Sequence, residues 1–102
     1  MAPVCGLDDQ GLIAQYDRYR RAGQGARVLE HSSRRLAIEL DPRVDRRLVE
    51  RLVAVERECC PFLGISWEPQ SGRLIVAVGQ DEHESALAAI AFALDLEGRH
   101  GR

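Results

Sequence analysis

No run of apolar residues in this 102-residue chain approaches the roughly 20 that a membrane-spanning helix needs. The N-terminal residues have neither the basic patch nor the long apolar stretch of a secretory signal. Hydrophobic residues make up 45% of the chain and charged residues 29%, which excludes disorder as a description of the whole chain. We therefore expect a single cytoplasmic domain over residues 1–102, in which 97–102 form a flexible tail.

Lysine is absent, and all 14 basic residues are arginines. GC-rich codons explain this usage most simply. Binding to nucleic acid or to an anionic membrane without sequence specificity depends on an excess of positive charge, whereas the formal net charge here is −2. The small arginine clusters at 18–21 and 34–35 are offset by acidic residues elsewhere in the chain. We therefore expect neither nucleic acid nor a membrane as a partner.

Several signatures of catalysis and metal binding are missing as well. The sequence has no phosphate-binding loop, no serine–histidine–aspartate arrangement and no pair of catalytic carboxylates. The Cys-x-x-Cys spacing of zinc ribbons and thioredoxins does not occur, and His31, His83 and His100 share no motif with one another. Zinc is therefore a weaker candidate than metals that accept fewer ligands.

Hydrophobic periodicity indicates helices and strands in turn along the chain. The predicted elements are a helix over Asp9–Ala22, strands over Val28–His31 and Arg35–Leu40, a helix that begins at Asp41–Pro42 and ends before Pro61, a hairpin with alternating apolar residues over 63–67 and 74–78, and a helix that begins at the capping box Asp81-x-x-Glu84. This order predicts an α+β two-layer sandwich, in which helices cover a four-stranded antiparallel sheet. A permuted ferredoxin-like topology would place the strands at 35–40 and 73–78 in its centre.

Strict alternation predicts which side chains face the core. The covered face of the sheet is expected to consist of Leu36, Ile38, Leu40, Leu74, Val76 and Val78. The helices are expected to bury the stripes Leu12/Ile13/Tyr16/Tyr19, Val44/Leu48/Leu52/Val55/Cys59 and Leu87/Ile90/Ala91/Leu94.

Cysteine occurs at three positions, Cys5, Cys59 and Cys60, and an odd number excludes pairing all of them in disulfides. In a reducing cytoplasm such thiols serve as packing, metal ligands or reactive groups. Cys59 continues the apolar stripe of the second helix and Cys60 falls at the edge of that stripe. We therefore expect Cys59 to be the more buried of the pair. Glu56 precedes Cys60 by one helical turn on the same side.

The expected environment of the cysteine pair favours metal binding over nucleophilic catalysis. A helix C-terminus and the neighbouring Glu56 and Glu58 both disfavour a free thiolate. A coordinating metal ion, by contrast, deprotonates its thiols outright, and soft thiolates select Cu(I), Hg(II) and As(III). Because these ions accept two or three sulfurs, we expect a site made by Cys5, Cys59 and Cys60. Cys5 would reach the pair if the first helix runs antiparallel to the second.

Other function classes stay open. One is a small thiol enzyme or redox protein, with Cys60 as the reactive thiol and Glu56 as a proton carrier. Another is a haem-responsive or redox-responsive regulatory module, because Cys60 and Pro61 form a Cys-Pro pair and a thiolate can ligate haem iron. The sequence also leaves open whether two copies associate as a homodimer.

The segment Glu-Arg-Glu-Cys-Cys-Pro-Phe-Leu over 56–63, followed by a hairpin and a short terminal helix, resembles a group of small, mostly uncharacterised bacterial proteins. These proteins similarly carry a cysteine before the first helix, then a basic segment, then a Cys-Cys-x-Phe signature. They tend to occur with functions in resistance to mercury and arsenic. The resemblance extends from Val4 to about Leu94. It implies that Cys5, Cys59 and Cys60 act together to sense, buffer or process a thiophilic metal ion.

Overall fold

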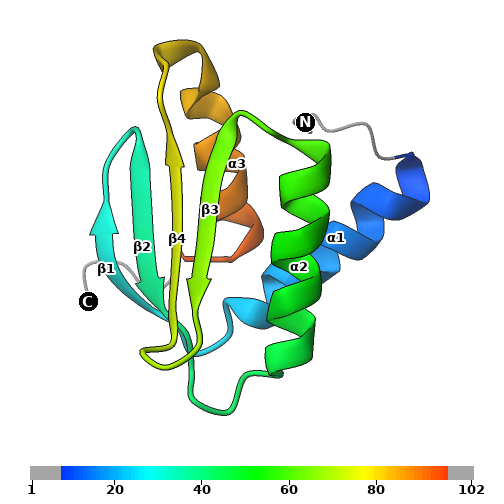
Figure 1. The fold of residues 1–102 in the computed structure, drawn as a ribbon, viewed down its shortest axis with the longest axis vertical. Coiled ribbons are helices and arrows are strands. Elements are labelled where there is room, and N and C mark those ends of the chain that lie inside the picture. Colours follow the sequence, from blue (N-terminus) through cyan, green and yellow to red (C-terminus); the bar gives the residue numbers. More distant parts are fainter. Residues whose placement is uncertain (1–7, 97–102) are drawn as a thin grey trace.

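The structure, a computed structural model, describes residues 8–96 (Figure 1). Its elements are α1 (Asp9–Ala22), β1 (Arg27–His31), β2 (Arg35–Glu39), α2 (Arg46–Cys59), β3 (Leu63–Glu68), β4 (Arg73–Val78), the 3-10 turn η1 (Asp81–His83) and α3 (Glu84–Ala93). The strands form one antiparallel sheet in the order β1-β2-β4-β3. The predicted α+β arrangement is confirmed, with β2 and β4 at the centre. The predicted tail over 97–102 lies outside the described residues.

The core lies between the sheet and the described helices, which share one side of it (Figure 1). All six predicted sheet residues are buried. The central four are less than 2% exposed, namely Leu36, Ile38, Leu74 and Val76. Over residues 8–96, no helix combines the length and the apolar character that crossing a membrane requires. The buried sheet residues and the helices form one apolar layer that stabilises the fold. The alternation of apolar residues in β2 and β4 specifies the sheet side of this layer.

Helix α1 has the predicted bounds but buries a different face. Its N-cap Asp8 accepts a hydrogen bond from the Gly11 N–H at 2.8 Å, as expected for a short acidic cap. Ile13 and Tyr16 were expected in the core, yet they are 69% and 43% exposed, whereas Gln15 is buried. Tyr19 is buried as predicted. The positions of Ile13 and Tyr16 were wrong because α2 offers a polar partner to Gln15, which turns a different side of α1 toward α2.

Helix α2 begins later than predicted, and its buried face is shifted. Asp45 is the N-cap, and its carboxylate accepts hydrogen bonds from the N–H groups of Arg47 and Leu48. Asp41, the predicted cap, instead accepts the Arg43 N–H within a turn before the helix. The fully buried positions of α2 are Val49, Leu52, Val53 and Glu56. The remaining predicted positions are only half-buried, namely Val44, Leu48, Val55 and Cys59.

Helix α3 follows the predicted Asp81 start after one 3-10 turn, and the predicted positions Leu87, Ile90, Ala91 and Leu94 are buried. Its C-terminal end lies against the end of α1. A side chain at Gly23 would collide with the carbonyl oxygen of Leu94, so only glycine fits at that crossing. Arg20 also donates a hydrogen bond to the Ala93 carbonyl at 2.9 Å. These contacts fix the C-terminal end of α1 against the C-terminal end of α3.

Candidate thiol site at the end of α2

The cysteine pair lies where α2 ends and the chain turns into β3. Cys59 is the last helical residue, and Cys60 is the C-cap with φ −130° and ψ 74°. These dihedrals lie outside the helical region, which the proline at the next position disfavours for Cys60. The Cys60 N–H still donates to the Glu56 carbonyl at 2.8 Å, and its own carbonyl accepts from the Leu63 N–H at 3.0 Å. The backbone around Cys60 is therefore fully engaged.

The burial of the pair is the reverse of the prediction. Cys60 is only 1% exposed and belongs to the core, whereas Cys59 is half-buried. The reason is the true phase of α2. Because Val49, Val53 and Glu56 face inward, the residue one turn after Glu56 continues that face, and this residue is Cys60. Cys59 is the more accessible sulfur.

The two sulfurs also differ in chemical state. Cys60 is disulfide-bonded, whereas Cys59 is a free thiol. The third predicted ligand, Cys5, lies outside the described residues, and its proximity to the pair stays a prediction. Among residues 8–96 no three histidine, cysteine or acidic side chains gather closely enough to hold a metal ion. A site with three ligands at the end of α2 therefore needs a ligand from outside that range.

A buried polar network ends one turn before Cys60. Glu56 is 5% exposed, and its Oε1 accepts hydrogen bonds from Gln15 Nε2 at 2.9 Å and from the Tyr19 hydroxyl at 2.8 Å. Gln15 Nε2 also donates to the Leu52 carbonyl at 3.0 Å, and Gln15 Oε1 accepts from Arg18 at 2.6 Å. Burial, followed by the Glu56 carboxylate, raises the pKa of Tyr19 well above its usual range. The network links α1 to the segment that carries the cysteines.

Sequence reasoning identified Glu56 but missed Gln15 and assigned Tyr19 to an apolar stripe. A signal was available in the sequence. Gln15 and Tyr19 are four residues apart, which places them on one face of a helix, and Glu56 interrupts an otherwise apolar face of the next helix. A polar pair on one helix and a lone carboxylate on another are the two halves of a buried hydrogen-bond network.

Arg57, the basic residue nearest the pair in sequence, points elsewhere. Its guanidinium donates two hydrogen bonds to the Ile65 carbonyl on the edge strand β3, at 3.2 and 3.1 Å. Phe62, two residues after Cys60, stacks on the ring of His83 with the ring centroids 4.2 Å apart. The segment that follows the cysteines is therefore held by a strand carbonyl on one side and by η1 on the other.

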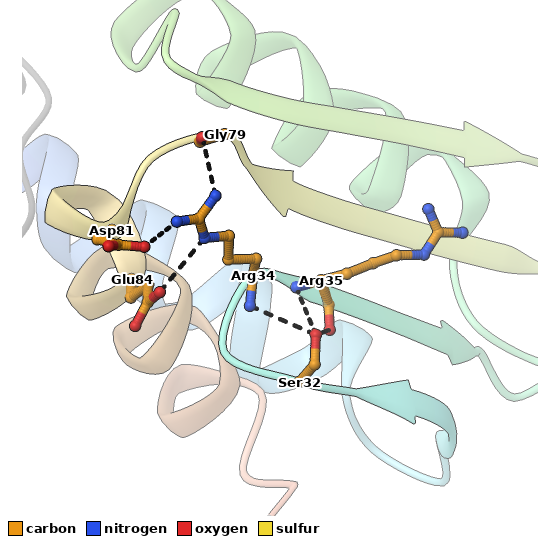
Figure 2. Close-up of polar contacts among 6 residues, drawn as sticks. All are labelled: Ser32, Arg34, Arg35, Gly79, Asp81 and Glu84. Carbon is orange, nitrogen blue, oxygen red and sulfur yellow. Dashed lines mark hydrogen bonds and ion pairs between the residues drawn. The ribbon is translucent and has the colours of Figure 1, made fainter.

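Arg34 fixes η1 from the turn between β1 and β2 (Figure 2). Its guanidinium donates to the Gly79 carbonyl at 3.1 Å and forms ion pairs with Asp81 and Glu84. Ser32 Oγ accepts the N–H groups of Arg34 and Arg35 in the same turn. This cluster anchors the start of α3, and it thereby holds His83 beside Phe62.

The histidines, which share no motif in the sequence, also lie apart from the cysteine pair or outside the described residues. His83 is half-buried and pairs with Glu82 at 3.7 Å, His31 lies exposed on the edge strand β1, and His100 lies outside the described residues. An open cavity of about 540 Å³ lies at the other end of α2 and is lined by Arg21, Asp41, Arg43 and Leu48 among others. Its arginines are already ion-paired, Arg43 with Asp41 and Arg21 with Asp17. We assign no function to this cavity.

Comparison of the chain with protein-family models, with curated proteins and with solved structures finds no match.

Proposed function

We propose that this chain binds a thiophilic metal ion, of the Hg(II), As(III) or Cu(I) type, through thiolates of Cys59, Cys60 and Cys5. The observation that carries the proposal is the pairing of one accessible and one buried sulfur at the carbonyl end of α2. An accessible thiol can capture an incoming ion by ligand exchange, and a buried one can hold it away from competing thiols in solution. Cys59 takes the first role and Cys60 the second.

The electrostatics of this end of α2 support a cation rather than a free thiolate. The last carbonyls of a helix carry partial negative charge, which favours a bound cation and disfavours an anion. Glu56 lies one turn away, and Arg57 donates to a strand carbonyl. A thiolate here gains little from its surroundings, whereas a soft metal ion supplies the compensating positive charge directly.

In this proposal the disulfide at Cys60 is the oxidised, resting form. Reduction by two equivalents of a low-molecular-weight thiol breaks the S–S bond and leaves two protein thiols, while the two small thiols become one disulfide. The proton of each protein thiol is lost when the metal binds. Cys5, the remaining cysteine of the sequence, is the proposed partner of Cys60 in the oxidised form.

The same disulfide favours a second candidate, a thiol–disulfide redox protein. A free Cys59 beside a disulfide-bonded Cys60 is an arrangement in which the bond can be exchanged with an external thiol. Cys60 would then be the reactive thiol, and Glu56 would carry the proton that its thiol gains or loses. This candidate requires turnover with a disulfide substrate, which a metal-binding protein does not.

Native mass spectrometry of the anaerobically reduced chain tests the proposal. The chain is titrated with Hg(II), As(III), Cu(I) and Zn(II) in the presence of an excess of a monothiol competitor. Each chain should bind one soft ion and lose its thiol protons. The competitor separates a built site from adventitious capture by single thiols. Cys59→Ser and Cys60→Ser should each weaken binding, and Ser33→Ala serves as the matched surface control. Failure of every soft ion to bind, combined with rapid reduction of a small disulfide substrate, would replace the first candidate with the second.

A further inference from the structure

Within residues 8–96, no helix covers the face of the sheet opposite α1, α2 and α3, and we call this face the open face (Figure 1). In antiparallel pairs, directly opposed residues point to the same side of the sheet. The pairing registers therefore place on the open face the residues Arg27 and Glu30 of β1, Arg35, Ala37 and Glu39 of β2, Arg73, Ile75 and Ala77 of β4, and Gly64, Ser66 and Glu68 of β3.

One row of this face is a ladder of alternating charge. Arg27 pairs in register with Glu39, Glu39 with Arg73, and Arg73 with Glu68, so the row runs plus, minus, plus, minus across all four strands. Arg27 and Glu39 already form an ion pair at 2.5 Å. The neighbouring row has an apolar centre of Ala37 and Ile75, which are opposed across β2 and β4. Ala37 is only 6% exposed and Ile75 is half-buried, so Ile75 supplies the apolar side chain that a partner can reach.

We propose that a second copy of this chain docks on this face, sheet against sheet, about a two-fold axis parallel to the strands. Such a rotation sets each row opposite the same row of the partner subunit, with the order of the strands reversed. Arg27 then faces Glu68 of the partner subunit, and Glu39 faces Arg73 of the partner subunit. An even number of alternating charges is self-complementary under this reversal, which is what a symmetric interface requires.

The second row fits the same rotation. Ala37 faces the partner subunit's Ile75, so a small apolar side chain meets a large one at two symmetric places. An axis perpendicular to the strands would instead keep each strand opposite its own copy. Centred on either row, it would set like charges together, Arg27 against Arg27 of the partner subunit or Glu30 against Glu30 of the partner subunit. Centred between the rows, it would set the charged Glu39 against the partner subunit's Ala37. The charges therefore select one of the two in-plane axes.

The size of the face indicates a weak association. With strands about 4.8 Å apart and residues rising about 3.4 Å each, the open face covers about 300 Å² per copy. Two copies would thus bury roughly 600 Å² in total, which is below the range of stable specific interfaces and fits a weak, transient one. We expect a dissociation constant in the micromolar range, and weaker binding as ionic strength rises because the ladder is exposed.

Sedimentation velocity over about 5 to 500 µM protein tests the inference, since a weak dimer shows itself by its concentration dependence. The background is Cys59→Ser, which removes covalent dimers made through the free thiol. Arg73→Glu places a carboxylate opposite the Glu39 of each partner, and Glu39→Arg places a guanidinium opposite each Arg73. Each variant alone should raise the dissociation constant at least about tenfold. Arg51→Glu, a charge reversal on the exposed side of α2, should leave it unchanged.

Mixing the two reversed variants gives the decisive measurement. In a mixed dimer the native Glu39 of one copy meets the native Arg73 of the other, and the two introduced charges also meet as opposites. Equimolar mixing should therefore restore association, which a loss of folding in either variant could not do. Circular dichroism and thermal melting check that both variants are folded. A chain that stays monomeric at every concentration, a dimer that is insensitive to both reversals, or a mixture that fails to associate would each overturn the inference.

Discussion

The Tyr19 hydroxyl donates a hydrogen bond of 2.8 Å to the buried carboxylate of Glu56, across the interface between α1 and α2. Tyr19 is 4% exposed and Glu56 is 5% exposed, so neither group can exchange this bond for one with water without local opening. An unsatisfied buried acceptor costs more than the bond itself contributes. The contact therefore ties the orientation of α1 to the helix that ends in the cysteine pair.

Tyr19→Phe removes the hydroxyl and leaves Glu56 with one donor fewer at Oε1. We expect the free energy of unfolding to fall by about 1–3 kcal/mol, because the loss falls on a buried charged group. Urea denaturation followed by circular dichroism measures it. Tyr16→Phe is the matched control. Its hydroxyl lies on an exposed face beside Arg20, so the change should stay within about 0.5 kcal/mol. Equal costs for the two variants would contradict the role given to the buried contact.

The raised pKa of Tyr19 predicts a loss of stability at alkaline pH. Tyr19 in the unfolded chain releases its proton near the ordinary tyrosine pKa of 10.0, whereas burial and Glu56 keep it protonated in the fold. The stabilisation is therefore complete below pH 10.0 and declines as pH rises beyond it, because the unfolded state loses protons first. Denaturation curves from neutral pH to pH 11, compared with those of Tyr19→Phe, should show a steeper decline for the native chain. Parallel curves would contradict this account.

The sheet could be predicted from the sequence because β2 and β4 alternate strictly, and one face of each is wholly apolar. The bounds of α1 followed from Asp8 at its start and glycine at its end. The buried faces of α1 and α2 were less accessible to prediction. Each helix has apolar residues on more than one side. Only the contact between the two helices, in which Gln15 of α1 bonds to Glu56 of α2, buries Gln15 and leaves Ile13 and Tyr16 exposed.

Leu52 is common to the predicted stripe of α2 and to its observed buried face, and it is completely buried. Leu52→Ala should lower the free energy of unfolding by about 2–5 kcal/mol, since α2 and the sheet can close only part of the cavity. Leu29→Ala is the control, because Leu29 is 42% exposed on the edge strand β1. Chemical denaturation of both variants gives the comparison. If Leu52→Ala cost as little as the control, the rotation of α2 that buries Leu52 would be contradicted.

The candidate site was predictable in its residues but not in its geometry. The adjacent cysteines before Pro61 mark the end of α2 in the sequence. Their relative burial depended on the phase of α2. The apolar stripe Val44/Leu48/Leu52/Val55 set that phase incorrectly, because the observed buried face is Val49, Leu52, Val53 and Glu56. The state of each sulfur depends on tertiary contacts that no local pattern encodes.

The difference in burial predicts the order of alkylation. In the folded, oxidised chain iodoacetamide should modify Cys59 and leave Cys60 unreacted, because Cys59 is the accessible free thiol and Cys60 is buried and disulfide-bonded. Peptide mapping by mass spectrometry identifies the modified residue. Reduction in denaturant should then expose all three cysteines to the reagent, which controls for intrinsic reactivity. Modification of Cys60 before Cys59 in the native chain would reverse the assignment of the two sulfurs.

Cys5 supplies the last test, because two adjacent thiols at a helix end make an incomplete site for an ion that favours three sulfurs. In the reduced chain Cys5→Ser should weaken the affinity for As(III) at least about tenfold, equivalent to roughly 1.4 kcal/mol. The affinity for Hg(II), which accepts two sulfurs, should fall by a smaller factor. Competition titrations against a dithiol chelator measure both affinities, with Ser33→Ala as the control. Because the two ions differ in the number of thiolates they accept, the ratio of the two losses reports the ligand count independently of any general effect on folding. Equal affinities of Cys5→Ser and the native chain for As(III) would reduce the site to Cys59 and Cys60 alone.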